Sequence, residues 1–163
     1  MSRPPLDPLI EAPSARPARR GGRPTKRRGA AALGLVPIFV DLSARHLRRV
    51  ADLTEEVPYP VGAKVVEEGL PGEALFVILE GEAQVTRRGR SIARLRPGDV
   101  FGEISVLDGG PRTATVLART PLLVLRLYRR DLTKLMQREP QIAARLLKEL
   151  ARRLRSSERA GNW

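Results

Sequence analysis

The sequence predicts a mainly β fold, a double-stranded β-helix or jelly roll, with one helix before the roll and two helices after it. Two observations lead to this prediction. Between residues 64 and 127, short segments rich in β-branched residues alternate with glycine and proline turn signals at nearly regular spacing. Helical periodicity precedes and follows this region. Many short strands in succession are typical of rolls and barrels.

Six short segments are the predicted strands. Their β-branched and aromatic residues favour an extended backbone. Turn signals separate them, for example Pro71-Gly72 and Pro97-Gly98, and the second pair suits the two central positions of a type II turn. The predicted strands are residues 64–68, 74–79, 83–87, 91–95, 114–118 and 122–127.

Helices are predicted on both sides of the roll. Ser43 suits the N-cap of the first helix, because its hydroxyl can accept from a free backbone N–H of the first turn. His46 is expected on the solvent side of this helix, among arginines. After the roll, a short helix is predicted over Asp131 to Gln137, and a longer one over Gln141 to Ser157, with Pro140 in its first turn.

The last predicted helix carries an apolar seam with 4-3-4 spacing, which is typical of coiled coils. Ile142 and Leu146 widen the seam into a stripe that suits a helix covering a barrel. Two interpretations therefore stay open, packing against the roll and pairing with a second copy as a homodimer. The seam consists of Ala143, Leu147, Leu150 and Leu154.

We divide the chain into a basic tail, residues 1–32, and a domain, residues 33–163. The tail holds six prolines, eight basic residues and two acids. It has too little apolar surface to offset the entropy of ordering, so we expect disorder. Residues 16–28 are a candidate nucleic-acid contact, because Gly22-Arg23-Pro24 resembles the core of an AT-hook, which places arginine in the DNA minor groove.

Composition limits the remaining function classes. A net charge of +12 favours contact with nucleic acid, an anionic membrane surface or a phosphorylated ligand. With no cysteine and one histidine, the chain lacks a thiolate nucleophile and the ligands of a metal-dependent barrel. There is no run of eighteen apolar residues, secretory signal, catalytic triad or Walker loop. We expect a cytoplasmic protein that is not an enzyme and holds no cofactor.

The stretch from Phe101 to Val116, FGEISVLDGGPRTATV, has the features of an anion site. Gly102 allows close approach of a ligand to the backbone, because it has no side chain. The helical turn that begins at Glu103 would direct free N–H groups at an anion. Arg112 offers a planar fork of donors for two phosphate oxygens. The carboxylate of Glu103 can lie beside a bound phosphate only if it accepts a hydrogen bond from a donor. A ribose hydroxyl would be such a donor.

This stretch closely resembles the phosphate-binding cassette of the cyclic nucleotide-binding domain family, whose pattern is F-G-E-[IL]-[AS]-L…P-R-[TSA]-A-[ST]-[VI]. The resemblance extends over about residues 36 to 155. It implies that Glu103 accepts from the ribose 2′-hydroxyl and that Arg112 pairs with the cyclic phosphate. Gly102 would make room while the N–H groups of Ile104 and Ser105 complete the anion nest. Thr113 would contact the phosphate or a guanine amino group.

The resemblance implies a regulatory module that binds a cyclic nucleotide and changes conformation. Cyclic AMP is favoured over cyclic GMP, which Thr113 leaves open. Val85 and Leu95 are candidate apolar walls for the base. Only six residues follow Ser157, so we expect no helix-turn-helix domain after the roll. The alternative is a ligand-free scaffold or interaction protein that contacts nucleic acid through its basic tail.

Overall fold

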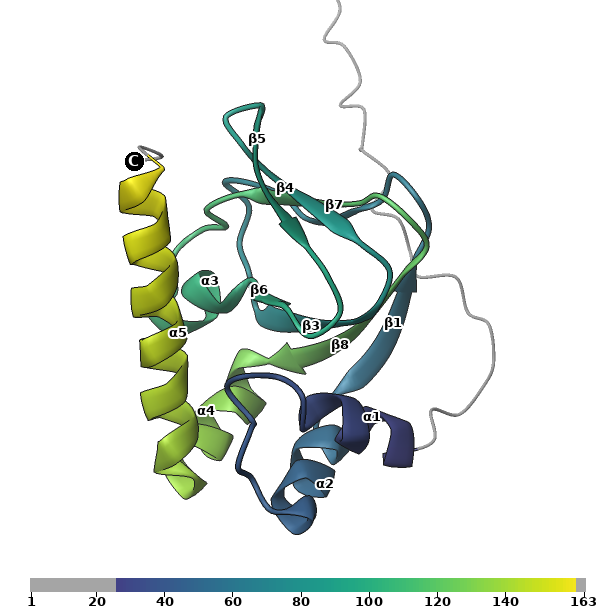
Figure 1. Ribbon diagram of the computed structural model, residues 1–163, viewed down its shortest axis with the longest axis vertical. Helices are drawn as coiled ribbons and strands as arrows, with labels where there is room; N and C mark the ends of the chain where they lie inside the picture. Colours follow the sequence, from purple (N-terminus) through teal and green to yellow (C-terminus); the bar gives the residue numbers. More distant parts are fainter. Residues whose placement is uncertain (1–25, 161–163) are drawn as a thin grey trace, which may run out of the picture.

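In the computed structural model, which describes residues 26–160, two antiparallel four-stranded sheets face each other as a jelly roll (Figure 1). The strand orders are β1-β8-β3-β6 and β2-β7-β4-β5. The predicted fold class is confirmed. The strands in this part of the chain are β1 Glu55–Tyr59, β2 Lys64–Val66, β3 Ala74–Glu80, β4 Ala83–Arg87, β5 Arg90–Leu95, β6 Val100–Phe101, β7 Thr115–Ala118 and β8 Leu122–Tyr128.

Helices cover one face of the first sheet and one side of the roll. In Figure 1, α1, α2 and α4 lie beneath the β1-β8-β3-β6 sheet, and α5 runs from α4 up toward β5. None of the helices within residues 26–160 is long and apolar enough to cross a membrane. The helices are α1 Lys26–Leu33, α2 Ala44–Asp52, α3 Glu103–Asp108, α4 Arg129–Arg138 and α5 Pro140–Arg159.

Strand β3 is buried on both faces and separates two apolar clusters. Its side chains alternate, so Leu75 and Val77 join the cluster under the helices, while Phe76 and Ile78 join the cluster between the sheets. This burial on two sides explains why β3 is apolar at nearly every position.

Two strands were not predicted from the sequence. Strand β1 contains two glutamates and Pro58, and it lies at the edge of its sheet, where polar residues and proline are tolerated. Strand β6 has only two residues and pairs with β3 next to the cassette. Neither segment has enough alternation of apolar and polar residues to be recognised as a strand from the sequence.

Helix α1 begins inside the segment that the sequence analysis assigns to the tail. Residues 26–32, which the sequence assigns to the tail, form most of helix α1. Ala30, Ala31 and Ala32 favour a helix, and the fully buried Leu33 anchors its end in the core. The other residues of the tail, with Gly22-Arg23-Pro24, lie outside the described residues.

His46 lies on the solvent side of α2, as predicted, with its side chain 34% exposed, and it also makes two contacts. Ser43 caps α2 as expected, because its hydroxyl accepts from the backbone N–H of His46 at 3.3 Å. The imidazole does not project freely into solvent. Its Nδ1 lies 3.1 Å from the Ser43 hydroxyl, and its Nε2 lies 3.1 Å from a carboxylate oxygen of Glu139. His46 therefore links α2 to the junction between α4 and α5.

Candidate functional site

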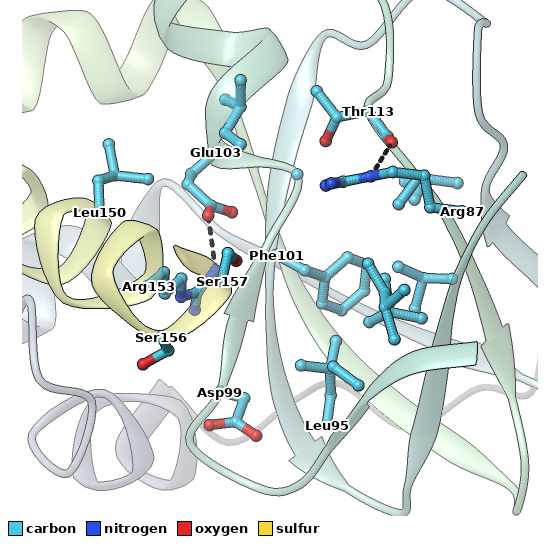
Figure 2. A pocket seen from close by; sticks show the side chains of 18 of the residues that line it. Arg87, Leu95, Asp99, Phe101, Glu103, Thr113, Leu150, Arg153, Ser156 and Ser157 are labelled. Carbon is cyan, nitrogen blue, oxygen red and sulfur yellow. Dashed lines mark hydrogen bonds and ion pairs between the residues drawn. The ribbon is translucent and has the colours of Figure 1, made fainter. Parts of the chain in front are cut away.

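A cavity of about 790 Å³ lies between the open end of the roll and helix α5. The cassette forms its floor, strands β4 and β5 form one wall, and the second half of α5 forms the other (Figure 2). Val85 and Leu95 both line it, as predicted. Phe101 lies in the wall between these apolar residues and stacks on Phe76, with ring centroids 5.1 Å apart. The pocket therefore combines an apolar side with a polar floor.

Arg112 is a buried cation on the floor of the pocket. Only 7% of the residue is exposed. Its Nη1 donates to the Gly102 carbonyl at 2.8 Å, and its Nη2 donates to the Ala74 carbonyl at 2.7 Å. No carboxylate within residues 26–160 lies close enough to form an ion pair with it. Burial lowers the pKa of the Arg112 guanidinium, while the charges of Glu103 and Glu73 act in the opposite direction. A buried arginine without an ion-pair partner favours the entry of an anion.

Two glycines make room for this arginine. A Cβ on Gly72 would lie 2.3 Å from both Nε and Cζ of Arg112, and a Cβ on Gly102 would lie 2.7 Å from its Nη1. Gly102 also has φ +78°, a left-handed conformation that glycine adopts without cost. We expected Gly102 to make room for the ligand. In the structure it also makes room for Arg112, which lines the pocket beside it.

Glu103 lies at the start of α3, and its side chain is only 5% exposed. Its Oε1 accepts from Nη1 of Arg153 at 2.6 Å, which joins the cassette to α5 (Figure 2). Arg153 also donates through Nη2 to the Val100 carbonyl at 2.6 Å. The second carboxylate oxygen, Oε2, receives no hydrogen bond from the described residues. Glu103 can therefore accept from a hydroxyl in the pocket without releasing Arg153.

The other predicted site residues also line the pocket. Ser105 is buried, and its hydroxyl donates to the Pro111 carbonyl at 3.2 Å, so the side chain holds the cassette together. Ile104 is partly exposed at the pocket edge, and Thr113 is exposed. The backbone N–H groups of Ile104 and Ser105 belong to the first turn of α3, where no intrahelical acceptor exists.

Arg129 connects the cassette to α4. Its Nη2 donates to the Ser105 carbonyl at 2.7 Å and to the Gly72 carbonyl at 3.1 Å. Arg129 is the first residue of α4, so this helix begins at a direct contact with α3. Each of the two last helices thus has its own arginine bound to the cassette, Arg129 from α4 and Arg153 from α5.

Sequence reasoning missed the polar groups that α5 brings to the pocket. These are Glu149, Arg152, Arg153, Ser156 and Ser157. Burial acts to raise the pKa of Glu149, but the hydrogen bonds and charges of Arg152 and Arg153 outweigh it, and the pKa lies below its ordinary value. These residues have no motif of their own. On the helix they resemble an ordinary solvated face, and only the docking of α5 places them over the cassette.

A further missed residue is Arg87 in β4. It lies on the opposite side of the pocket from α5, next to Thr113 (Figure 2). Its Nε donates to the Thr113 carbonyl at 3.1 Å. Strand alternation could have found it, because Arg87 is two residues beyond the pocket-lining Val85 and so faces the same side of β4.

Comparison with known proteins agrees with this geometry. The chain is 35% identical over 130 residues to the cyclic AMP receptor protein of Thermus thermophilus, a match that covers 77% of this chain and 57% of that protein. It superimposes on the crystal structure of the catabolite activator protein of Thermus thermophilus with a TM-score of 0.71 at 34% identity, over 75% of this chain and 60% of that one.

A second group of relatives consists of regulatory subunits of cAMP-dependent protein kinase. The cAMP-dependent protein kinase regulatory subunit of Aspergillus fumigatus is 35% identical over 103 residues, which is 62% of this chain and 25% of that protein. The curated relatives named here are longer, and the chain spans between 25% and 57% of their lengths. The cyclic nucleotide-binding domain profile matches residues 56–139, just over half of the chain. The chain therefore belongs to the cyclic nucleotide-binding domain family.

Proposed function

We propose that the chain is a regulatory sensor that binds a purine 3′,5′-cyclic nucleotide and carries out no catalysis. The buried Arg112, which has no carboxylate partner at the floor of the pocket, is the observation that carries this proposal. The cyclic phosphate would take the exposed side of its guanidinium and the free N–H groups of Ile104 and Ser105. The ribose 2′-hydroxyl would donate to Oε2 of Glu103.

The coupling from ligand to output runs through the two arginines that hold the cassette. A ligand that contacts α3 would change the position of α4 through the contact of Arg129 with Ser105. It would change the position of α5 through the ion pair of Arg153 with Glu103. Such a ligand favours whichever arrangement of the two helices gives it the better contacts, and its differential affinity sets the size of the shift. The described contacts of both arginines therefore support a switch rather than a passive binding site.

The relatives support cyclic AMP as the nucleotide, because the names of the Thermus receptor and the Aspergillus kinase subunit both contain it. The contacts of Glu103 and Arg112 concern the ribose and the phosphate only, so they do not choose the base. A homodimer through α5 also remains a proposal, supported by Leu147 and Leu154, which are 67% and 49% exposed on one face of the helix. The same holds for a cytoplasmic location and for nucleic-acid contact through residues 16–28.

Titration calorimetry of the full chain with cyclic AMP and cyclic GMP tests the proposal. We expect micromolar or tighter binding of one of them. Arg112→Lys keeps the charge but loses the planar fork, and the loss of one charged hydrogen bond corresponds to about a 10- to 100-fold weaker affinity. Arg96→Lys, an exposed arginine outside the pocket, is the matched control and should bind as the wild type does.

A 2′-deoxy cyclic nucleotide tests the second contact. Its affinity should be lower than that of the ribose form in the wild type, and the difference should shrink in Glu103→Gln. Absence of heat with both cyclic nucleotides at millimolar concentration would overturn the proposal. The ligand-free scaffold, in contact with nucleic acid through the tail, would then be the remaining explanation.

A further inference from the structure

The β4–β5 hairpin carries a cluster of arginines without acidic partners. Residues 87–96 contain five arginines and no aspartate or glutamate. None of the five forms an ion pair with a carboxylate of the described residues. Four of them are exposed, and the hairpin projects beyond the rest of the roll (Figure 1). The cluster consists of the half-buried Arg87 and the exposed Arg88, Arg90, Arg94 and Arg96.

Three of these arginines are unfavourable for the hairpin itself. Arg87 and Arg90 lie directly opposite each other across the two strands, and like charges in this position destabilise a sheet. Arg88 has φ +49°, a left-handed conformation that asparagine or glycine adopts at lower cost in a tight hairpin turn. The stability of the fold therefore does not explain why arginine occupies these positions.

Strand β5 is also the longest free edge of the two sheets. It has six residues, while the other edge strands within residues 26–160, β1, β2 and β6, have five, three and two, and β1 contains Pro58. The one neighbour of β5 in its sheet is β4. In an antiparallel ladder every second residue directs its N–H and C=O away from the neighbouring strand. None of the described residues forms a backbone hydrogen bond to these outward groups of β5.

The free strand edge and the surplus of positive charge together define the partner. Backbone donors and acceptors alternate along the edge, and an extended polypeptide offers both in the matching order. The phosphate oxygens of a nucleic acid accept hydrogen bonds but do not donate them, so they would leave the outward carbonyl groups of β5 unpaired. A second copy of β5 would bring arginines against arginines. An added strand that carries carboxylates satisfies the backbone and the charge at once.

We propose that the outer edge of β5 binds an extended acidic segment of a partner protein, which adds one strand to the β2-β7-β4-β5 sheet. Backbone hydrogen bonds along the edge hold the segment, and its carboxylates pair with Arg90, Arg94 and Arg96. Charged side chains on an edge strand ordinarily prevent pairing with other chains, so the arginines exclude neutral and basic strands while they admit an acidic one. The inference goes beyond the proposed nucleotide binding, because it concerns the edge of β5 and no ligand in the pocket.

The probe is a fluorescein-labelled synthetic peptide of about eight residues with alternating glutamate and valine, long enough to cover β5. It is titrated with the full chain in fluorescence anisotropy. In the triple variant Arg90→Gln, Arg94→Gln and Arg96→Gln its affinity should fall about 3- to 150-fold, which corresponds to three exposed ion pairs. The variant should melt at or above the wild-type temperature, because Arg90→Gln removes the repulsion from Arg87.

A matched control removes the same charge from another surface. Arg45, Arg48 and Arg49 of α2 are exposed and form no ion pair with a described carboxylate. The triple variant Arg45→Gln, Arg48→Gln and Arg49→Gln should weaken the peptide less than about twofold, because exposed charges beyond a Debye length are largely screened. Hydrogen exchange gives a second readout: at saturating peptide the amides of β5 should exchange more slowly, and those of α2 should not change.

Four results would overturn the inference. One is failure of the wild type to bind the peptide at millimolar concentration, and another is equal weakening by the hairpin and α2 variants, which would show general charge attraction. Unchanged exchange of the β5 amides at saturating peptide would exclude strand addition. If the hairpin variant instead lost affinity for a DNA duplex and kept its affinity for the peptide, the hairpin would be a nucleic-acid contact. No cyclic nucleotide takes part in these measurements, so each result leaves the proposed sensor function to its own test.

Discussion

Substitution of Arg153 by methionine should destabilise the chain much more than the same substitution of its neighbour Arg152. Arg153 is 35% exposed and pairs with Glu103, whose side chain is 5% exposed. Arg152 is 71% exposed and pairs with Glu149. Both arginines pair with Glu149, and only Arg153 also pairs with Glu103, so the comparison measures what the contact between α5 and the cassette contributes.

The magnitude follows from what each substitution leaves behind. Arg153→Met leaves a nearly buried carboxylate without its donor and removes the hydrogen bond to the Val100 carbonyl. Breaking a buried ion pair costs about 3–5 kcal/mol, and water reaching the partly exposed Arg153 site reduces this to about 2–3 kcal/mol. In Arg152→Met the lost partner is an exposed arginine and Glu149 keeps its ion pair with Arg153, so the cost should be about 0–1 kcal/mol.

Chemical denaturation and thermal melting measure the loss of unfolding free energy in each of the two variants. For a chain of this size the larger loss corresponds to a melting temperature lower by about 4–10 °C. The double variant Glu103→Gln with Arg153→Met should be less destabilised than the sum of the single variants, because each removes the same contact. Equal effects of Arg152→Met and Arg153→Met, or strict additivity in the cycle, would refute the proposed role of the contact.

The remaining predictions concern the pocket, pH, the tail and assembly. Gly72→Ala should abolish cyclic-nucleotide binding in calorimetry, because the new Cβ occupies the position of the Arg112 guanidinium; wild-type affinity would contradict this geometry. Since the folded-state pKa of Glu149 is lowered, its contribution to stability is present above pH about 4.5 and is lost as the pH falls through the folded pKa. Between pH 5 and 3 the melting temperature should therefore decrease less steeply in Glu149→Gln than in the wild type. DNA affinity in fluorescence anisotropy should decrease steeply with salt and disappear when residues 1–25 are deleted, a deletion that keeps helix α1, and binding that survives the deletion would exclude these residues as its source. If α5 mediates a homodimer, Leu147→Glu should give a monomer by light scattering, and an unchanged mass would exclude that face.

The roll could be predicted from sequence because its information is local. Strands such as β3 and β4 carry their own β-branched residues, and the turns between them carry glycine at positive φ, as at Gly81 and Gly98. The same holds for the cassette, whose glycine, glutamate and arginine stand in one continuous stretch. A site contained in sixteen successive residues can be recognised before its fold is known.

The other half of the pocket could not be predicted, because it depends on contacts between distant segments. Arg153 is 50 residues from Glu103, and nothing in the sequence of α5 distinguishes it from Arg152 or Arg155. The same applies to Arg112, for which the sequence indicates a phosphate contact but no role in the fold. Because its guanidinium satisfies two buried carbonyls, Arg112→Ala should also destabilise the roll.

The last helix of the described chain is a wall of the pocket, so a ligand bound there would contribute to the folding of that helix. Residues 149–160 follow all strands of the roll in the sequence, so the nascent chain can complete its roll before it has a complete binding site. A ligand that touches both the cassette and α5 would then hold the helix in place, and the backbone amides of α5 should exchange with deuterium more slowly when nucleotide is present. The amides of β3, buried on both faces, should show little change. Local protection of α5 would thus measure occupancy of the pocket.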